Sequence, residues 1–180
     1  MFKGREKSMN PDFIEKYIEE YGRDVYSFCV YLTRNTKDAE DLYQQTFLVA
    51  IDKGELDDNK NPKSYLISVA ANIWNNHKRK YMWRKKKANI VYLENDDVQQ
   101  LAENGETIEE KLIRRDEEEL VRALVNRLPD KLRMVIIMYY MEDMAVDEIA
   151  RALAISSGTV KSRLHQAKNK LKERLMNYER

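Results

Sequence analysis

The most informative stretch of this sequence reads DEIARALAISSGTVKSRLHQAK and runs from Asp147 to Lys168. Its apolar residues recur at helical spacing in two short sets separated by a turn, a pattern typical of a helix-turn-helix. These residues are Ile149, Ala150 and Leu153 in the first helix, Ile155 in the turn, and Val160, Leu164, Ala167, Leu171 and Leu175 in the second helix. We expect the two helices to pack together through them.

The opposite face of the second helix combines small polar side chains with cations. At about 100° per residue, the outward positions are Gly158, Ser162, His165, Gln166 and Asn169. The flanking cations are Lys161, Lys168 and Lys172 on one side and Arg163 and Lys170 on the other. Because polar groups can read base edges and cations can contact phosphates, the pattern predicts a DNA-binding helix. The alternative is a solvated cationic helix that only closes a bundle.

The composition indicates a helical protein. Of 180 residues 43% are apolar, enough for the core of one domain or of two small ones. Five glycines and three prolines, among many strong helix formers, favour an all-α fold. The longest apolar run, residues 134–141, is too short to span a bilayer. A single cysteine and an N-terminus without an apolar stretch predict a cytoplasmic protein.

Charge is segregated along the chain although the net charge is only +1. Residues 78–87 carry seven cations and no acid, whereas residues 90–110 carry seven acids and no lysine or arginine. This contrast predicts two small helical domains joined by an acidic flexible linker. We expect an N-terminal tail at 1–9, a four-helix domain at 10–87, the linker at 88–108, and a second four-helix domain at 109–180.

Apolar spacing and capping residues predict the helices of the first domain. An opening helix would use Phe13, Tyr17 and Tyr21, and a second would use Val25, Phe28, Cys29 and Leu32. A third helix would begin near Thr36 as N-cap, and a fourth at Asn61-Pro62, with Leu66, Val69, Ala70, Ile73 and His77 on its inner face. Cys29 is expected to be a small core residue, and for Trp74 burial and base stacking both stay open.

The second domain is expected to begin near Glu109. Its first helix would use Leu112, Leu120, Leu124 and Leu128 and end at Pro129. The next would use Leu132, Val135, Ile136 and Tyr139.

The sequence offers no set of residues for catalysis. Its two histidines lie far apart, it has one cysteine, and it lacks a glycine-rich phosphate loop. We therefore predict that the chain is not an enzyme and binds no metal or cofactor. The alternative is a metal-dependent nuclease built on linker acids such as Asp96 and Asp97.

Three motifs occur in one order along the chain. They are DAEDLYQQTF from Asp38; SYLISVAAN from Ser64, followed by Asn76 and Arg79; and LPDKLRMV from Leu128, with EIA from Glu148 and GTVKSRL from Gly158. From about residue 10 to 177 the chain thereby resembles the group 4, or extracytoplasmic-function, sigma factors of bacterial RNA polymerase. In that family the motifs form the polymerase-docking helix, the promoter-melting helix and the C-terminal DNA-binding domain.

The resemblance implies three sets of binding residues. The polymerase-docking residues would be Asp38, Glu40, Asp41, Gln44 and Gln45. The residues for the minus-10 DNA would be Asn59, Lys60, Asn61, Tyr65, Asn72, Asn75, Asn76, Arg79 and Lys80. The residues for the minus-35 DNA would be Ser157, Gly158, Thr159, Lys161, Ser162, Arg163, His165 and Gln166.

The resemblance also implies the partners. These are core RNA polymerase, through the β′ clamp coiled coil and the β subunit, promoter DNA, and an anti-sigma factor that is often membrane-anchored. No small-molecule substrate and no membrane insertion of the chain itself are implied. The alternatives are a helix-turn-helix regulator that binds duplex DNA alone and a helical interaction protein without a DNA role.

Some positions depart from the family pattern. Ala154 stands where glycine commonly opens the turn, at a cost of about 1 kcal/mol if the backbone needs positive φ. Tyr65 replaces a usual tryptophan, Asn76 a frequent aspartate, and Gln166 a common arginine. Because glutamine can pair with adenine whereas arginine favours guanine, the promoter sequence is expected to differ.

Overall fold

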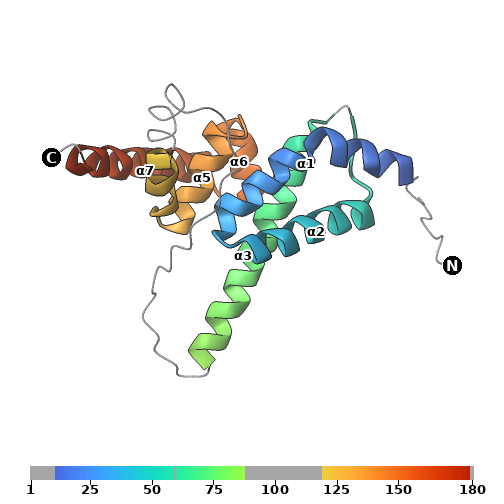
Figure 1. Ribbon diagram of the computed structural model, residues 1–180, viewed down its shortest axis with the longest axis horizontal. Coiled ribbons are helices and arrows are strands. Elements are labelled where there is room, and N and C mark those ends of the chain that lie inside the picture. Colours follow the sequence, from blue (N-terminus) through green and yellow to red (C-terminus); the bar gives the residue numbers. More distant parts are fainter. Residues whose placement is uncertain (1–10, 59, 88–118, 179–180) are drawn as a thin grey trace, which may run out of the picture. The chain divides into compact units, whose positions relative to one another are not determined.

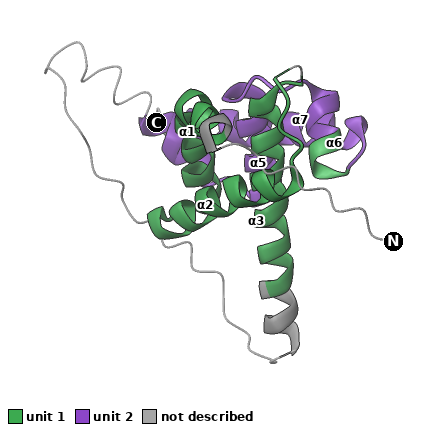
Figure 2. Cartoon of the chain, turned by 90° about the vertical axis from the view of Figure 1, so that its right-hand side faces the viewer, with its two compact units in different colours: residues 1–91, 151–154 green, residues 92–150, 155–180 purple. Residues whose placement is uncertain are grey.

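The computed structural model describes residues 11–58, 60–87 and 119–178 (Figure 1). Every regular element in these ranges is a helix, which confirms the all-α prediction. The chain divides into two compact units, residues 1–91 with 151–154 and residues 92–150 with 155–180 (Figure 2). The expected tail at 1–9 and linker at 88–108 lie outside the described residues.

Three helices form the described part of the first unit. They are α1 (Pro11–Thr33), α2 (Thr36–Lys53) and α3 (Pro62–Lys87), and each packs against the other two. Their shared core consists of Tyr17, Val25, Phe28, Cys29, Leu32, Ala39, Leu42, Phe47, Ala50, Leu66, Ile67, Val69, Ala70 and Ala71. The prediction that Cys29 is a small core residue is confirmed, since it is buried and not in a disulfide.

The prediction of two helices before residue 34 is wrong, because α1 continues unbroken from Pro11 to Thr33. Gly22 is buried inside this helix, and a Cβ there would lie 2.8 Å from the hydroxyl oxygen of Tyr43 on α2. Gly22 therefore lies within the helix and, because it has no side chain, lets α1 and α2 approach each other closely.

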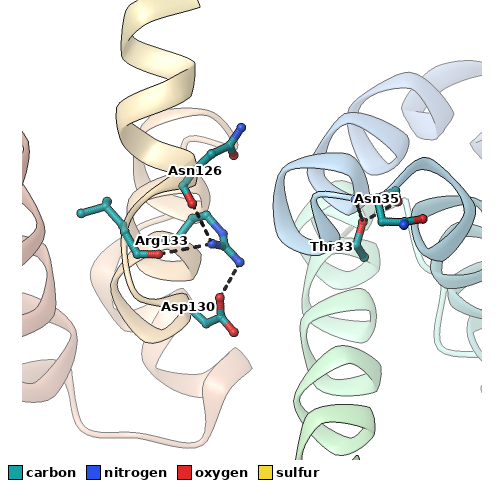
Figure 3. A network of polar contacts seen from close by, with 6 residues as sticks. Thr33, Asn35, Asn126, Asp130 and Arg133 are labelled. Carbon is teal, nitrogen blue, oxygen red and sulfur yellow. Dashed lines mark hydrogen bonds and ion pairs between the residues drawn. The ribbon is translucent and has the colours of Figure 1, made fainter. Parts of the chain in front are cut away.

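A tight turn joins α1 to α2. Arg34 has a φ of 59°, and the Thr33 hydroxyl donates to the Asn35 carbonyl over 2.9 Å (Figure 3). Asn35, not Thr36 as predicted, is the N-cap of α2, because its backbone is extended and its Oδ1 accepts from the Asp38 amide over 3.1 Å. Asparagine is among the strongest N-cap residues, so the helix starts one position earlier than expected.

The loop between α2 and α3 has capped ends. Gly54 ends α2 with a φ of 60°, and its amide donates to the carbonyls of Ala50 and Ile51. Asn61 begins α3, since its Oδ1 accepts from the Ser64 amide over 3.1 Å and Pro62 is the first helical residue. The predicted start of this helix is confirmed.

The second unit contains helical residues 119–126, α5 (Asp130–Tyr140), the first residues of α6 (Val146–Leu153) and α7 (Ser157–Tyr178). All residues from Leu132 to Met138 are buried, so α5 is the central helix of this unit. The predicted break before Pro129 is confirmed. Tyr139 is exposed although it continues the expected apolar row, and Leu112 lies outside the described residues.

A buried arginine holds the turn before α5 (Figure 3). Arg133 has no exposed surface, and its guanidinium donates to the carbonyls of Asn126 and Leu128, each over 3.3 Å, and to Asp130 over 2.6 Å. Arg133 thereby satisfies the carbonyl of Asn126 at the end of residues 119–126 and that of Leu128 in the turn.

Candidate functional site

The predicted helix-turn-helix is present as α6 and α7. Ile149 and Ala150 are buried on α6, and the Ile155 amide closes the turn by donating to the Ala150 carbonyl over 3.0 Å. Ala154 has a φ of 51°, so the residue that stands in place of glycine occupies the left-handed region. The turn forms with alanine at a backbone conformation that favours glycine.

Hydroxyl groups fix the start of α7. The Oγ of Ser156 accepts from the Thr159 amide over 3.1 Å and lies 2.8 Å from the Thr159 hydroxyl. The Ser157 hydroxyl donates to Asp147 on α6 over 2.6 Å. Ser157 and Thr159, two of the predicted minus-35 residues, thus already have partners within the protein.

The two faces of α7 differ as the sequence predicted. Val160, Leu164 and Ala167 are buried, whereas Arg163 is half-buried. The exposed residues on the other side are Gly158, Lys161, Ser162, His165, Gln166, Lys168, Asn169, Lys170 and Lys172. Gln166 donates to the Ser162 hydroxyl over 3.1 Å, and both side chains keep further donor or acceptor groups for contact with a base.

The predicted polymerase-docking residues lie on two edges of α2. Asp38, Asp41 and Gln45 line a cleft of about 300 Å³ between α2 and α3. Glu40 and Gln44 instead line a shallow depression between α1 and α2, beside Tyr26 and Tyr43. The structure thus divides a set that the sequence treated as one face.

Leu48 is a surface feature that the sequence analysis missed. It lies on α2 one turn after Gln44 and Gln45, and it is 64% exposed. A leucine exposed to this degree beside polar residues is a candidate contact for a partner protein. Its position four residues after Gln44 is the signal that could have found it.

Trp74 lines the cleft between α2 and α3 together with His77 and Lys78. Lys78 Nζ lies 5.5 Å from the centre of the indole ring. The indole Nε1 is buried without a hydrogen-bond partner, although the side chain as a whole is half-buried. Of the two alternatives for Trp74, burial and base stacking, the structure favours packing between the helices. His77 was expected on the inner face of this helix but is exposed.

The predicted minus-10 residues of α3 form an exposed row. Asn72, Asn75, Asn76, Arg79 and Lys80 are all exposed, and the Arg79 guanidinium donates to Asn76 over 3.2 Å. Lys60 and Asn61 are exposed in the preceding loop, and Asn59 lies outside the described residues.

Tyr65 differs from these residues because it is half-buried. Burial, reinforced by the nearby carboxylate of Glu55, raises the pKa of Tyr65 to about 12. The phenol is therefore neutral and is largely turned into the protein.

Two absences hold within the part of the chain that the structure describes. There, no three His, Cys, Asp or Glu side chains are grouped so that they could hold a metal ion. No helix in those ranges has both the length and the apolar character that crossing a membrane requires.

Comparison with known proteins identifies the family. Residues 17–84 match the sigma-70 region 2 family, and residues 118–171 match sigma-70 region 4. The ECF RNA polymerase sigma factor SigW of Bacillus subtilis is 26% identical over 94% of this chain and 92% of its own length. The RNA polymerase sigma-E factor of Streptomyces coelicolor is 31% identical over 77% of this chain and 72% of its own length.

Solved structures share the fold. The sigma factor RpoE of Bartonella quintana, in complex with the anti-sigma factor NepR, has a TM-score of 0.71 and 23% identity, over 92% of this chain and 97% of its own. CnrH, in complex with the cytosolic domain of CnrY, has a TM-score of 0.64 and 18% identity, over 94% and 92%. With both regions matched in order and a relative above 30% identity, the chain belongs to the extracytoplasmic-function sigma factors of the sigma-70 family.

Proposed function

We propose that this chain binds core RNA polymerase and directs it to a dedicated set of promoters. In this proposal α2 docks on the β′ clamp coiled coil, the α2–α3 loop and the outer row of α3 bind the minus-10 element, and α7 binds the minus-35 element. Residues 10–87 and 109–180 act as the two domains, and 88–108 as the linker. As an initiation factor in the cytoplasm, the chain would catalyse no reaction of its own.

The two-sided character of α7 is the observation that carries the proposal. Its apolar side is buried, while Ser162, His165 and Gln166 are exposed among lysines. An exposed row of this kind matches the edges of bases, and its lysines match the phosphates on either side.

Neutral and cationic side chains support the same role for α3. Asn72, Asn75 and Asn76 can donate to and accept from unpaired bases, and Arg79 and Lys80 can contact the strand backbone. On α2, the acids Asp38 and Asp41 suit attraction to a basic partner.

We further propose control by an anti-sigma factor. The solved relatives RpoE and CnrH were each captured with another protein, NepR and the cytosolic domain of CnrY respectively. Exposed Leu48 and the cleft at Trp74 supply a surface that an inhibitor could cover in competition with polymerase.

Reconstituted transcription tests the proposal. Purified chain and core polymerase should initiate transcripts on DNA taken from upstream of the chain's own operon, and Lys161→Ala should weaken initiation most at low salt and make it less dependent on salt. Lys131→Ala is the matched control, because Lys131 is an exposed cation of α5 rather than α7. Binding of intact duplex by the chain alone, without any response to polymerase, would favour a stand-alone regulator instead.

A further inference from the structure

We propose that Tyr17 and Asp58 form a clamp that fixes the described part of the α2–α3 loop, residues 54–58 and 60–61, and that this clamp positions the loop to discriminate between bases of single-stranded DNA. The inference rests on the proposed function, because it concerns the same minus-10 surface. It adds two residues that lie outside the row of α3 and that act by positioning rather than by touching DNA.

The clamp joins a core residue to the loop. Tyr17 lies on α1 with no exposed surface, and its hydroxyl donates to Asp58 Oδ1 over 2.7 Å. Lys16, the preceding residue of α1, donates to the other carboxylate oxygen over 2.8 Å. Both oxygens of Asp58 are thereby held by one turn of α1, 41 and 42 positions away in the sequence.

The Tyr17 bond is the stronger half of the clamp. Lys16 and Asp58 have side chains that are 51% and 53% exposed, so their ion pair is screened by water and contributes little. Tyr17 is packed in the core and loses little freedom when it donates to a carboxylate. A rigid phenol therefore sets where Asp58 lies.

Asp58 is one of several points that hold the loop. Leu56 is 7% exposed and packs into the core of the first unit. The Lys60 amide donates to the Asp57 carbonyl over 3.0 Å and closes a turn, and Asn61 then caps α3. With Leu56 and Asp58 both anchored, exposed Lys60 is presented at one fixed place beside the start of α3.

Fixed placement matters for discrimination between bases. A binding group held rigidly by neighbouring contacts distinguishes ligands by geometry, whereas a loose loop adapts to each of them. The clamp should therefore affect which sequence is bound more than how tightly DNA is bound on average.

The first test needs no DNA. Amide hydrogen exchange of the full chain should show faster exchange at loop residues, including Lys60, in Tyr17→Phe and Asp58→Ala than in the wild type. Tyr21→Phe is the matched control, because the Tyr21 hydroxyl donates to Glu20 on its own helix over 2.7 Å and not to the loop. If the exchange rates of the loop amides are the same in Tyr17→Phe and Asp58→Ala as in the wild type, the proposal that these residues fix the loop is wrong.

The second test measures discrimination by the holoenzyme. Core polymerase loaded with each variant is offered a pool of randomised single-stranded DNA, and the bound and unbound fractions are sequenced. Tyr17→Phe should reduce the preference for the selected sequence about tenfold, because a loop that is no longer held in one place adapts to other bases. Tyr21→Phe should keep the preference, and Asp58→Asn, which retains an acceptor for Tyr17, should fall between them.

Two outcomes separate the clamp from the proposed function. An equal loss of affinity for every sequence in Tyr17→Phe would mean a purely structural role and would overturn the positioning claim. A wild-type holoenzyme with no preference within the pool would overturn the proposed function of this surface, while the exchange result would still decide whether the clamp exists.

Discussion

Arg133 donates to Asp130 over 2.6 Å even though the arginine side chain is fully buried and the aspartate is 26% exposed. The same guanidinium also serves the carbonyls of Asn126 and Leu128. A buried charge is tolerated only when such partners surround it, so this arginine ties the turn before α5 to the centre of the second unit.

Arg133→Ala should therefore lower the free energy of unfolding by about 3 kcal/mol, because it leaves two carbonyls without donors and a cavity in the core. Urea denaturation followed by circular dichroism measures the change. Arg127→Ala is the control, because Arg127 is exposed and should matter by less than about 0.5 kcal/mol. Similar losses in the two variants would contradict a special role for Arg133.

Gly22 and Tyr43 should behave as a coupled pair. In the wild type, Gly22→Ala places a Cβ 2.8 Å from the Tyr43 hydroxyl oxygen and should destabilise the protein by about 1 kcal/mol. In a Tyr43→Phe background the same change should instead stabilise by about 0.5–1 kcal/mol, because alanine favours a helix over glycine. A double-mutant cycle checks this, and purely additive effects would contradict the close approach.

Local signals were readable from the sequence, whereas contacts between distant segments were not. The Asn61-Pro62 start of α3 and the faces of α7 follow from capping chemistry and apolar spacing within one element. Two helices were expected where α1 is one, and the reason for Gly22 within it is a side chain of α2. The division of the docking residues likewise depends on where α1 and α3 pack on α2, which no spacing within α2 specifies.

Ala154→Gly should stabilise the helix-turn-helix. Its φ of 51° strains an alanine, and glycine should relieve about 0.5–1 kcal/mol after allowance for its greater freedom in the unfolded chain. Thermal denaturation measures the change. Gly54→Ala is the mirror control, because Gly54 has a φ of 60° with nothing within 4 Å of a Cβ, so it should destabilise through the backbone alone. Equal signs for the two substitutions would contradict this account.

Tyr65 should make the first unit sensitive to alkali. Its pKa is raised to about 12 in the folded protein by burial and by Glu55, from an ordinary value of 10.0. A raised pKa means that the stabilisation is complete below the ordinary value and is lost as the pH rises from 10.0 toward about 12. Tyrosine ionisation is followed by absorbance in pH titrations of the wild type and of Tyr65→Phe. The phenol that the variant lacks should be one that ionises near pH 12 in the folded protein. If the variant instead lacks a phenol that ionises near pH 10.0, the burial of the Tyr65 hydroxyl would be contradicted.

Gln166 should set one base of the minus-35 element if α7 binds there as proposed. Its amide can form two hydrogen bonds with the N6 and N7 atoms of adenine, whereas an arginine at this exposed position would pair with guanine. Gln166→Arg should therefore shift the preferred base at one position by about tenfold in holoenzyme binding to a template pool randomised in that element. Glu173→Gln makes the same change in net charge at an exposed position further along α7 and should leave the preference unchanged. A uniform gain in affinity for all templates in both variants would show that Gln166→Arg acts through charge alone, and Gln166 would then lose its assignment as a base-reading residue.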